Sequence, residues 1–78
     1  MTVQTFRELL TAQPFQPFRL VLSSGKAYDV RHPEMAFLSR TSIYVGVDIA
    51  DDNVPADYRI CSLLHVTAVE PLDRKSVV

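Results

Sequence analysis

Five residues between positions 19 and 44 have the side-chain chemistry of a ligand-binding face. Arg19 and Arg31 are basic, Tyr28 and Tyr44 can stack on bases, and His32 adjoins them in the sequence. Arginines beside aromatic rings are the groups with which proteins hold single-stranded RNA or DNA. The sequence therefore predicts a possible ligand or nucleic-acid face at these five positions. The alternative is a charged outer strand face that keeps a sheet edge soluble.

Catalytic chemistry has weaker support. His32 and Glu34 flank Pro33, and they are either an acid–base pair, half of a metal site, or a polar corner at a strand end. Cys61 and His65 lie four residues apart, but a strand and a turn should separate them, which favours a buried structural thiol. Because no set of nucleophile, base and orienting group can be assembled, we expect no enzymatic activity and no cofactor.

Residues 48–57 are acidic and polar and contain Pro55, so we predict a long loop there. Five oxygen-bearing side chains in it could bind a hard cation: Asp48, Asp51, Asp52, Asn53 and Asp57. The glycine and the terminal glutamate of a calcium loop are missing. We interpret the segment as a solvated acidic loop and expect no metal.

The composition limits the classes of partner. The formal net charge of −1 gives no general attraction for a phosphate backbone. A single cysteine, Cys61, cannot form an intramolecular disulfide, and a reducing compartment suits it. No signal peptide and no apolar run of about 20 residues is visible. We therefore expect a soluble, cytoplasmic protein without membrane contact.

A helix over about residues 3–12 is predicted. One apolar stripe supports it, formed by Val3, Phe6, Leu9 and Leu10. Thr5 and Glu8 fit a capping box, and Thr2 is the alternative N-cap one turn earlier. The stripe must dock on another element, because three helical turns alone are unstable in water.

Alternating apolar residues predict strands in the rest of the chain. Phe18, Leu20 and Leu22 share one face of a hairpin over residues 18–31, with a turn at Ser24–Gly25. Further strands are expected at about 35–39, 43–48, 58–62 and 66–71, followed by a tail at 73–78.

Local irregularities are also predicted in the second half of the chain. Gly46 indicates a bulge or a close backbone approach, and residues 63–65 interrupt the alternation as a single 3₁₀ turn. In the last strand, Val66, Ala68 and Glu70 are placed on one face.

These elements predict one domain over residues 1–78. Its fold class is mainly β with one N-terminal helix, and about five short antiparallel strands form a small SH3-like or Sm-like barrel or a strongly bent sheet. Closing the sheet would remove edges that an open sheet of this size exposes.

Three motifs carry a resemblance that covers nearly the whole chain. They are Pro14-Phe15-x-Pro17-Phe18, then Gly25-Lys26, then Val30-x-His32-Pro33-Glu34, with a final strand at His65–Glu70. In these motifs the chain resembles a widespread family of short uncharacterised bacterial proteins, a resemblance that implies no function. The order of elements is also similar to Sm-like proteins, which form rings and bind RNA.

One leading function and two alternatives follow as hypotheses. The first is a non-enzymatic binding or assembly module, which joins copies of itself or a protein partner through a strand edge or oligomer interface. The alternative is an Sm-like RNA-binding protein. An enzyme or a metal-binding protein is the second alternative.

Overall fold

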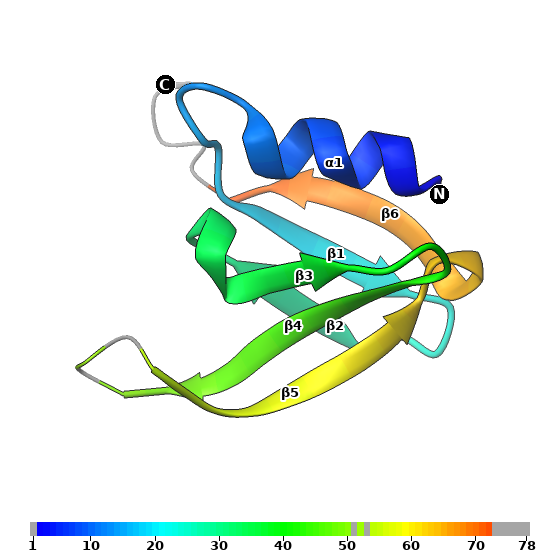
Figure 1. Ribbon diagram of the computed structural model, residues 1–78. Helices are drawn as coiled ribbons and strands as arrows, with labels where there is room; N and C mark the ends of the chain where they lie inside the picture. The colour runs from blue at the N-terminus through cyan, green and yellow to red at the C-terminus, as the bar shows by residue number, and fades with distance from the viewer. Residues whose placement is uncertain (1, 51, 53, 73–78) are drawn as a thin grey trace.

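An N-terminal helix and two three-stranded antiparallel sheets make up the computed structural model, which describes residues 2–50, 52 and 54–72 (Figure 1). The elements in chain order are α1 (Val3–Thr11), β1 (Phe18–Leu22), β2 (Ala27–Val30), η1 (Pro33–Met35), β3 (Ala36–Leu38), β4 (Ser42–Ile49), β5 (Pro55–Ser62), η2 (Leu63–His65) and β6 (Val66–Pro71). One sheet has the order β2-β1-β6 and the other β3-β4-β5. The predicted class, mainly β with one N-terminal helix, is confirmed.

Helix α1 begins one turn earlier than the Thr5 capping box predicts. Thr2 is the N-cap, and its Oγ1 accepts a hydrogen bond from the Thr5 N–H at 3.3 Å. The prediction of Thr2 as the N-cap is therefore confirmed, and the predicted capping box at Thr5 is wrong. The earlier start brings Val3 into the packed stripe with Phe6, which is completely buried and lies 6.2 Å from the Phe18 ring.

The β1–β2 hairpin has the predicted turn. Gly25 takes a positive φ of 92°, which glycine adopts without steric cost, and its N–H donates to the Leu22 carbonyl at 2.9 Å. The resulting register sets Phe18 opposite Val30 and Leu20 opposite Tyr28. The predicted apolar face of β1 is thus turned to the core.

Strand β6 departs from the predicted alternation. The register of β6 against β1 shifts by one residue beside Val21 and Leu22, which marks a β-bulge. Because of this shift, Val66 and Val69 both pack on the core, although they lie three residues apart. The prediction that Val66 shares a face with Ala68 and Glu70 is therefore wrong.

In the second sheet, β4 is longer than predicted and lies between β3 and β5. Strand β4 continues to Ile49, and β5 already begins at Pro55, where a proline is tolerated as the first strand residue. The predicted loop over residues 48–57 is therefore wrong for much of its length. Within it, Asp51 and Asn53 lie outside the described residues.

Gly46 is a point of close approach. The β4–β5 register is regular through Gly46, so no bulge is present there. A Cβ atom on Gly46 would lie 2.9 Å from the Cβ of Pro55 and 3.4 Å from the Met35 carbonyl oxygen. A close approach to Gly46 is therefore present, but the group that approaches most closely is the Pro55 side chain and not a neighbouring backbone, and a methyl group on Gly46 would overlap with it.

The two sheets and the helix enclose one core. Its buried members are Phe6, Phe18, Leu20, Val30, Ala36, Ile43, Val45, Cys61, Leu63 and Val66. Short 3₁₀ turns connect the sheets, and η2 falls at the predicted residues Leu63–His65. Among the described residues, β2 lies against β4 without pairing, so a closed barrel is not detected. Within the same part of the chain, no helix has the length and apolar character needed to cross a membrane.

We predict that Gly46→Ala destabilises the protein by about 1–3 kcal/mol, because the added methyl group overpacks against Pro55. Thermal unfolding should show a Tm lower by several degrees. The cost should shrink in a Pro55→Gly background, where the nearest ring atoms are gone. An unchanged Tm for Gly46→Ala would contradict the close approach.

Candidate functional site

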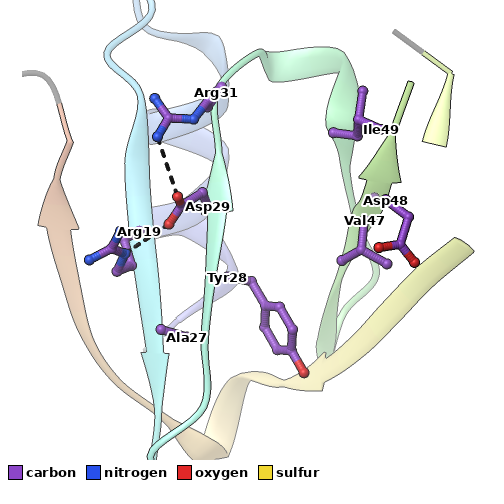
Figure 2. A pocket seen from close by; sticks show the side chains of 9 residues that line it. Arg19, Ala27, Tyr28, Asp29, Arg31, Val47, Asp48 and Ile49 are labelled. Atoms are coloured by element: carbon purple, nitrogen blue, oxygen red, sulfur yellow. Dashed lines mark hydrogen bonds and ion pairs between the residues drawn. The ribbon is translucent and has the colours of Figure 1, made fainter. Parts of the chain in front are cut away.

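A cleft lies between the first hairpin and β4 (Figure 2). Its volume is about 520 Å³, and the residues that line it are Arg19, Ala27, Tyr28, Asp29, Arg31, Gly46, Val47, Asp48 and Ile49. Arg19, Tyr28 and Arg31 were predicted as site residues, and the structure brings these three together.

The two arginines of the cleft share one carboxylate. Arg19 Nε donates to Asp29 Oδ1 at 2.8 Å, and Arg31 Nη2 donates to Asp29 Oδ2 at 3.4 Å. Figure 2 shows both guanidinium groups converging on Asp29. The hydrogen bond that Arg19 donates to Asp29 raises the pKa of Arg19 above its ordinary value. One carboxylate thus offsets part of the positive charge available to a ligand.

Tyr28 points away from the arginines, toward β5 (Figure 2). Its ring packs partly on the core, and its hydroxyl group lies near enough to Arg59 to influence the pKa of that guanidinium. Asp48 acts on Arg59 in the same direction. The far end of the cleft is therefore bordered by β5, and Arg59 belongs to its electrostatic surroundings.

The other two predicted residues lie elsewhere. His32 is exposed just before η1, and its carbonyl oxygen accepts the Met35 N–H at 3.0 Å. Tyr44 stands on the outer face of the second sheet, between Phe37 and Ile60 in register. The five predicted residues therefore do not form one continuous face.

The Cys61 and His65 side chains line one pocket, and within the described residues they make no hydrogen bond to each other. Cys61 is buried, and burial raises the pKa of its thiol, which opposes formation of the thiolate. His65 Nδ1 instead lies 3.5 Å from Ser23 Oγ. Within the described residues, no group of three or more potential metal ligands gathers.

A second feature, which the sequence prediction did not include, is the free edge of β5. In the described part of the chain, β5 pairs with β4 alone, and residues 56–60 are all exposed. The Leu63 N–H donates to the Thr41 carbonyl at 2.9 Å and continues the β4–β5 ladder. Since backbone directions alternate along a strand, odd-numbered residues of β5 face β4. The N–H and C=O groups of Ala56, Tyr58 and Ile60 consequently point away from the sheet.

The side chains of Asp57 and Arg59 hydrogen-bond the outward backbone groups of Tyr58 on this edge. The Tyr58 N–H donates to Asp57 Oδ1 at 2.8 Å, and Arg59 Nη1 donates to the Tyr58 carbonyl at 3.3 Å. Asp57 and Arg59 also contact each other at 3.1 Å. We call Asp57 and Arg59 the edge ion pair. The hydrogen bond from Tyr58 and, second, the one from Arg59 lower the pKa of Asp57 below its ordinary value.

An exposed apolar patch adjoins the same edge. Phe37, Tyr44, Tyr58 and Ile60 lie on the outer face of the second sheet, and we call them the aromatic patch. Ile60 is 66% exposed and Phe37 is 54% exposed. The Phe37 and Tyr58 rings lie 5.7 Å apart and tilted, which is an attractive arrangement.

Searches of family models, curated proteins and solved structures found no match. The geometry of the chain itself is therefore the basis for assigning a function.

The sequence does contain a signal for the β5 site. Alternation placed Tyr58 and Ile60 on one face of a strand, and Asp57 and Arg59 flank Tyr58 with opposite charges. What the pattern lacked was the identity of the neighbouring strands. Only the sheet order makes β5 an edge.

We predict that Arg59→Gln raises the pKa of Asp57 toward the ordinary carboxyl value of about 4 without reaching it, because the Tyr58 N–H is the larger cause of the shift. Carboxyl carbon shifts followed by NMR against pH in dilute protein would measure this.

The same pKa shift has a consequence for stability. Because the folded pKa is lowered, the stabilisation from the edge ion pair is complete above about pH 4 and is lost as the pH falls through the folded value.

Arg40→Gln, an exposed substitution outside β5, is the control for the NMR measurement and should leave the pKa of Asp57 unchanged. An unshifted pKa in the native chain would disprove the capping geometry.

Proposed function

We propose that this protein is a non-enzymatic assembly module, which adds a strand of another polypeptide to the free edge of β5. The observation that carries the proposal is the exposure of five consecutive residues, 56–60, on a strand with one neighbour among the described residues. Exposed edge strands with apolar side chains are templates for pairing with another chain.

The side chains along this edge support the proposal. Proteins that avoid pairing place charged side chains, prolines or bulges on an edge strand, and the two charges in the middle of β5, Asp57 and Arg59, contact each other. Strand β5 has a proline only at its first residue, and its register against β4 is regular. Its middle presents Tyr58 and Ile60, which belong to the aromatic patch. Strand addition would satisfy the outward backbone groups and cover part of that patch.

The proposal also includes a fold family and a cellular location for the protein. We propose that the two sheets are the halves of an SH3-like barrel that is open between β2 and β4. The return of β6 to β1 after a 3₁₀ turn supports this topology. The buried free thiol of Cys61 suits a reducing, cytoplasmic compartment.

We predict that Ile60→Lys weakens assembly by at least tenfold, because it places a charge within the paired edge. Sedimentation equilibrium over a range of concentrations would measure the association. Leu64→Lys is the matched control, since Leu64 is 90% exposed but lies in η2, outside β5. An assembly unaffected by Ile60→Lys, or a strict monomer without a protein partner, would refute the proposal.

A second candidate function has its own observation. Arg19, Tyr28 and Arg31 line one cleft, and arginines combined with an aromatic ring can hold single-stranded RNA, although Tyr28 points away from both arginines here. Arg31 is the more available arginine, since its side chain is more exposed and its contact with Asp29 is longer. The acidic Asp48 on the opposite wall opposes this function.

If the cleft binds RNA, Tyr28→Ala and Arg31→Ala should each weaken binding of a labelled single-stranded RNA by about tenfold, through lost stacking and lost charge. Fluorescence anisotropy at low salt would measure the affinity. Arg40→Ala removes one charge outside the cleft and should have a smaller effect. No binding of the native chain at low salt would exclude this function.

A further inference from the structure

We propose that the polypeptide added to β5 is a second copy of this chain, paired antiparallel about a two-fold axis at Tyr58. This inference rests on the proposed strand addition and specifies its partner and register. It follows from the directions of the backbone groups and from the charges that flank Tyr58.

Backbone geometry first limits the possible registers. In an antiparallel pair, residues that exchange hydrogen bonds must both direct their N–H and C=O groups toward the partner. On β5 these residues are Ala56, Tyr58 and Ile60. An axis at Tyr58 pairs Tyr58 with its copy and Ala56 with Ile60 of the other chain. Each of these pairs would exchange two backbone hydrogen bonds.

The charges then select among the registers that backbone geometry allows. With the axis at Tyr58, Asp57 of each copy lies directly opposite Arg59 of the other. Moving the axis one residue toward the amino terminus sets Asp57 opposite Asp57, and one residue toward the carboxyl terminus sets Arg59 opposite Arg59. Like charges directly opposite each other destabilise a sheet, and opposite charges stabilise it. The Tyr58 axis is therefore favoured over both neighbouring registers.

The edge ion pair has a different role in each state. In the single chain, Asp57 and Arg59 bond each other and occupy the N–H and C=O groups of Tyr58. In the paired state, the second copy's Tyr58 takes over those backbone groups, and each charged side chain gains an opposite charge across the axis. Asp57 and Arg59 thus each exchange a partner within the chain for the opposite charge on the second copy. Pairing therefore leaves neither charge without a partner.

The aromatic patch continues across the same axis. Tyr58 already contacts Phe37 on its own sheet, with ring centroids 5.7 Å apart. Residues directly opposite in an antiparallel pair project to the same face, so the two Tyr58 rings would lie side by side. A row of four aromatic rings would then join the two outer faces. Ile60 would lie beside Ala56 of the second copy.

A charge-swap series tests the register. D57R places arginines opposite each other at both symmetric positions, and R59D does the same with aspartates. Each variant alone should therefore dimerise on the order of tenfold more weakly than the native chain at low salt. An equimolar mixture of the two should form a heterodimer, because every charge then faces its opposite. Native mass spectrometry would distinguish the heterodimer, and the D57R/R59D double variant should recover homodimerisation.

Charge-matched controls accompany the series. Glu34→Arg and Arg40→Asp change exposed residues outside β5 and should leave dimerisation unchanged. A native chain that is monomeric at every concentration overturns this inference. Dimers that Ile60→Lys dissociates but that the charge series does not affect also overturn it, and the proposed edge assembly then survives. Dimers that Ile60→Lys leaves intact refute the assembly through β5 itself.

Cysteine cross-linking provides a second measurement that does not depend on charge. Residues in a hydrogen-bonded antiparallel pair have Cα atoms about 5.5 Å apart, which a disulfide can bridge. Tyr58→Cys should therefore give a covalent dimer under mild oxidation. Ile60→Cys should not, because the two Ile60 positions are four residues out of register. Cross-linking of Ile60→Cys instead of Tyr58→Cys would contradict the axis.

Discussion

The burial of Phe6 against Phe18 is the packing contact on which the rest of the fold depends. A helix of nine residues is unstable alone, and two small sheets have little apolar area to bury. Phe6 joins these incomplete parts, because its ring lies in the core enclosed by the inner faces of both sheets. The cost of building a core from short strands is that some of their edges stay open.

Strand β5 has such an open edge in the described part of the chain. Its inner residues, such as Cys61, complete the core, while its middle is exposed on both the edge and the outer face. The edge ion pair satisfies the outward backbone groups of Tyr58 from within the same strand. Such a closure is reversible, because exposed ion pairs contribute little to stability. The same two charged residues can therefore protect the edge in the single chain and bind a second strand in the proposed dimer.

The sequence predicted best where short-range chemistry decides the structure. The Gly25 turn, the inward face of β1 and the 3₁₀ turn at Leu63–His65 depend on local conformation and on residues close in sequence. The helix was predicted within one residue at its end, but its cap was misplaced, because Thr2 and Thr5 are both acceptable locally and packing chooses between them. The prediction failed in β6, where a bulge against β1 changes which residues face the core.

In the candidate site, too, some features could be predicted from the sequence and others depend on the tertiary structure. The sequence by itself determined that Arg19, Tyr28 and Arg31 lie on one hairpin, although strand alternation turns Tyr28 to the face opposite the two arginines. It also determined that Asp57 and Arg59 flank Tyr58 with opposite charges. Only the tertiary structure decided that Tyr44 lies on a different sheet, that Asp29 is shared by both arginines, and that β5 has a free edge. The physical reason is that alternation along a strand specifies its two faces, whereas the neighbours of its two edges depend on pairing between distant segments.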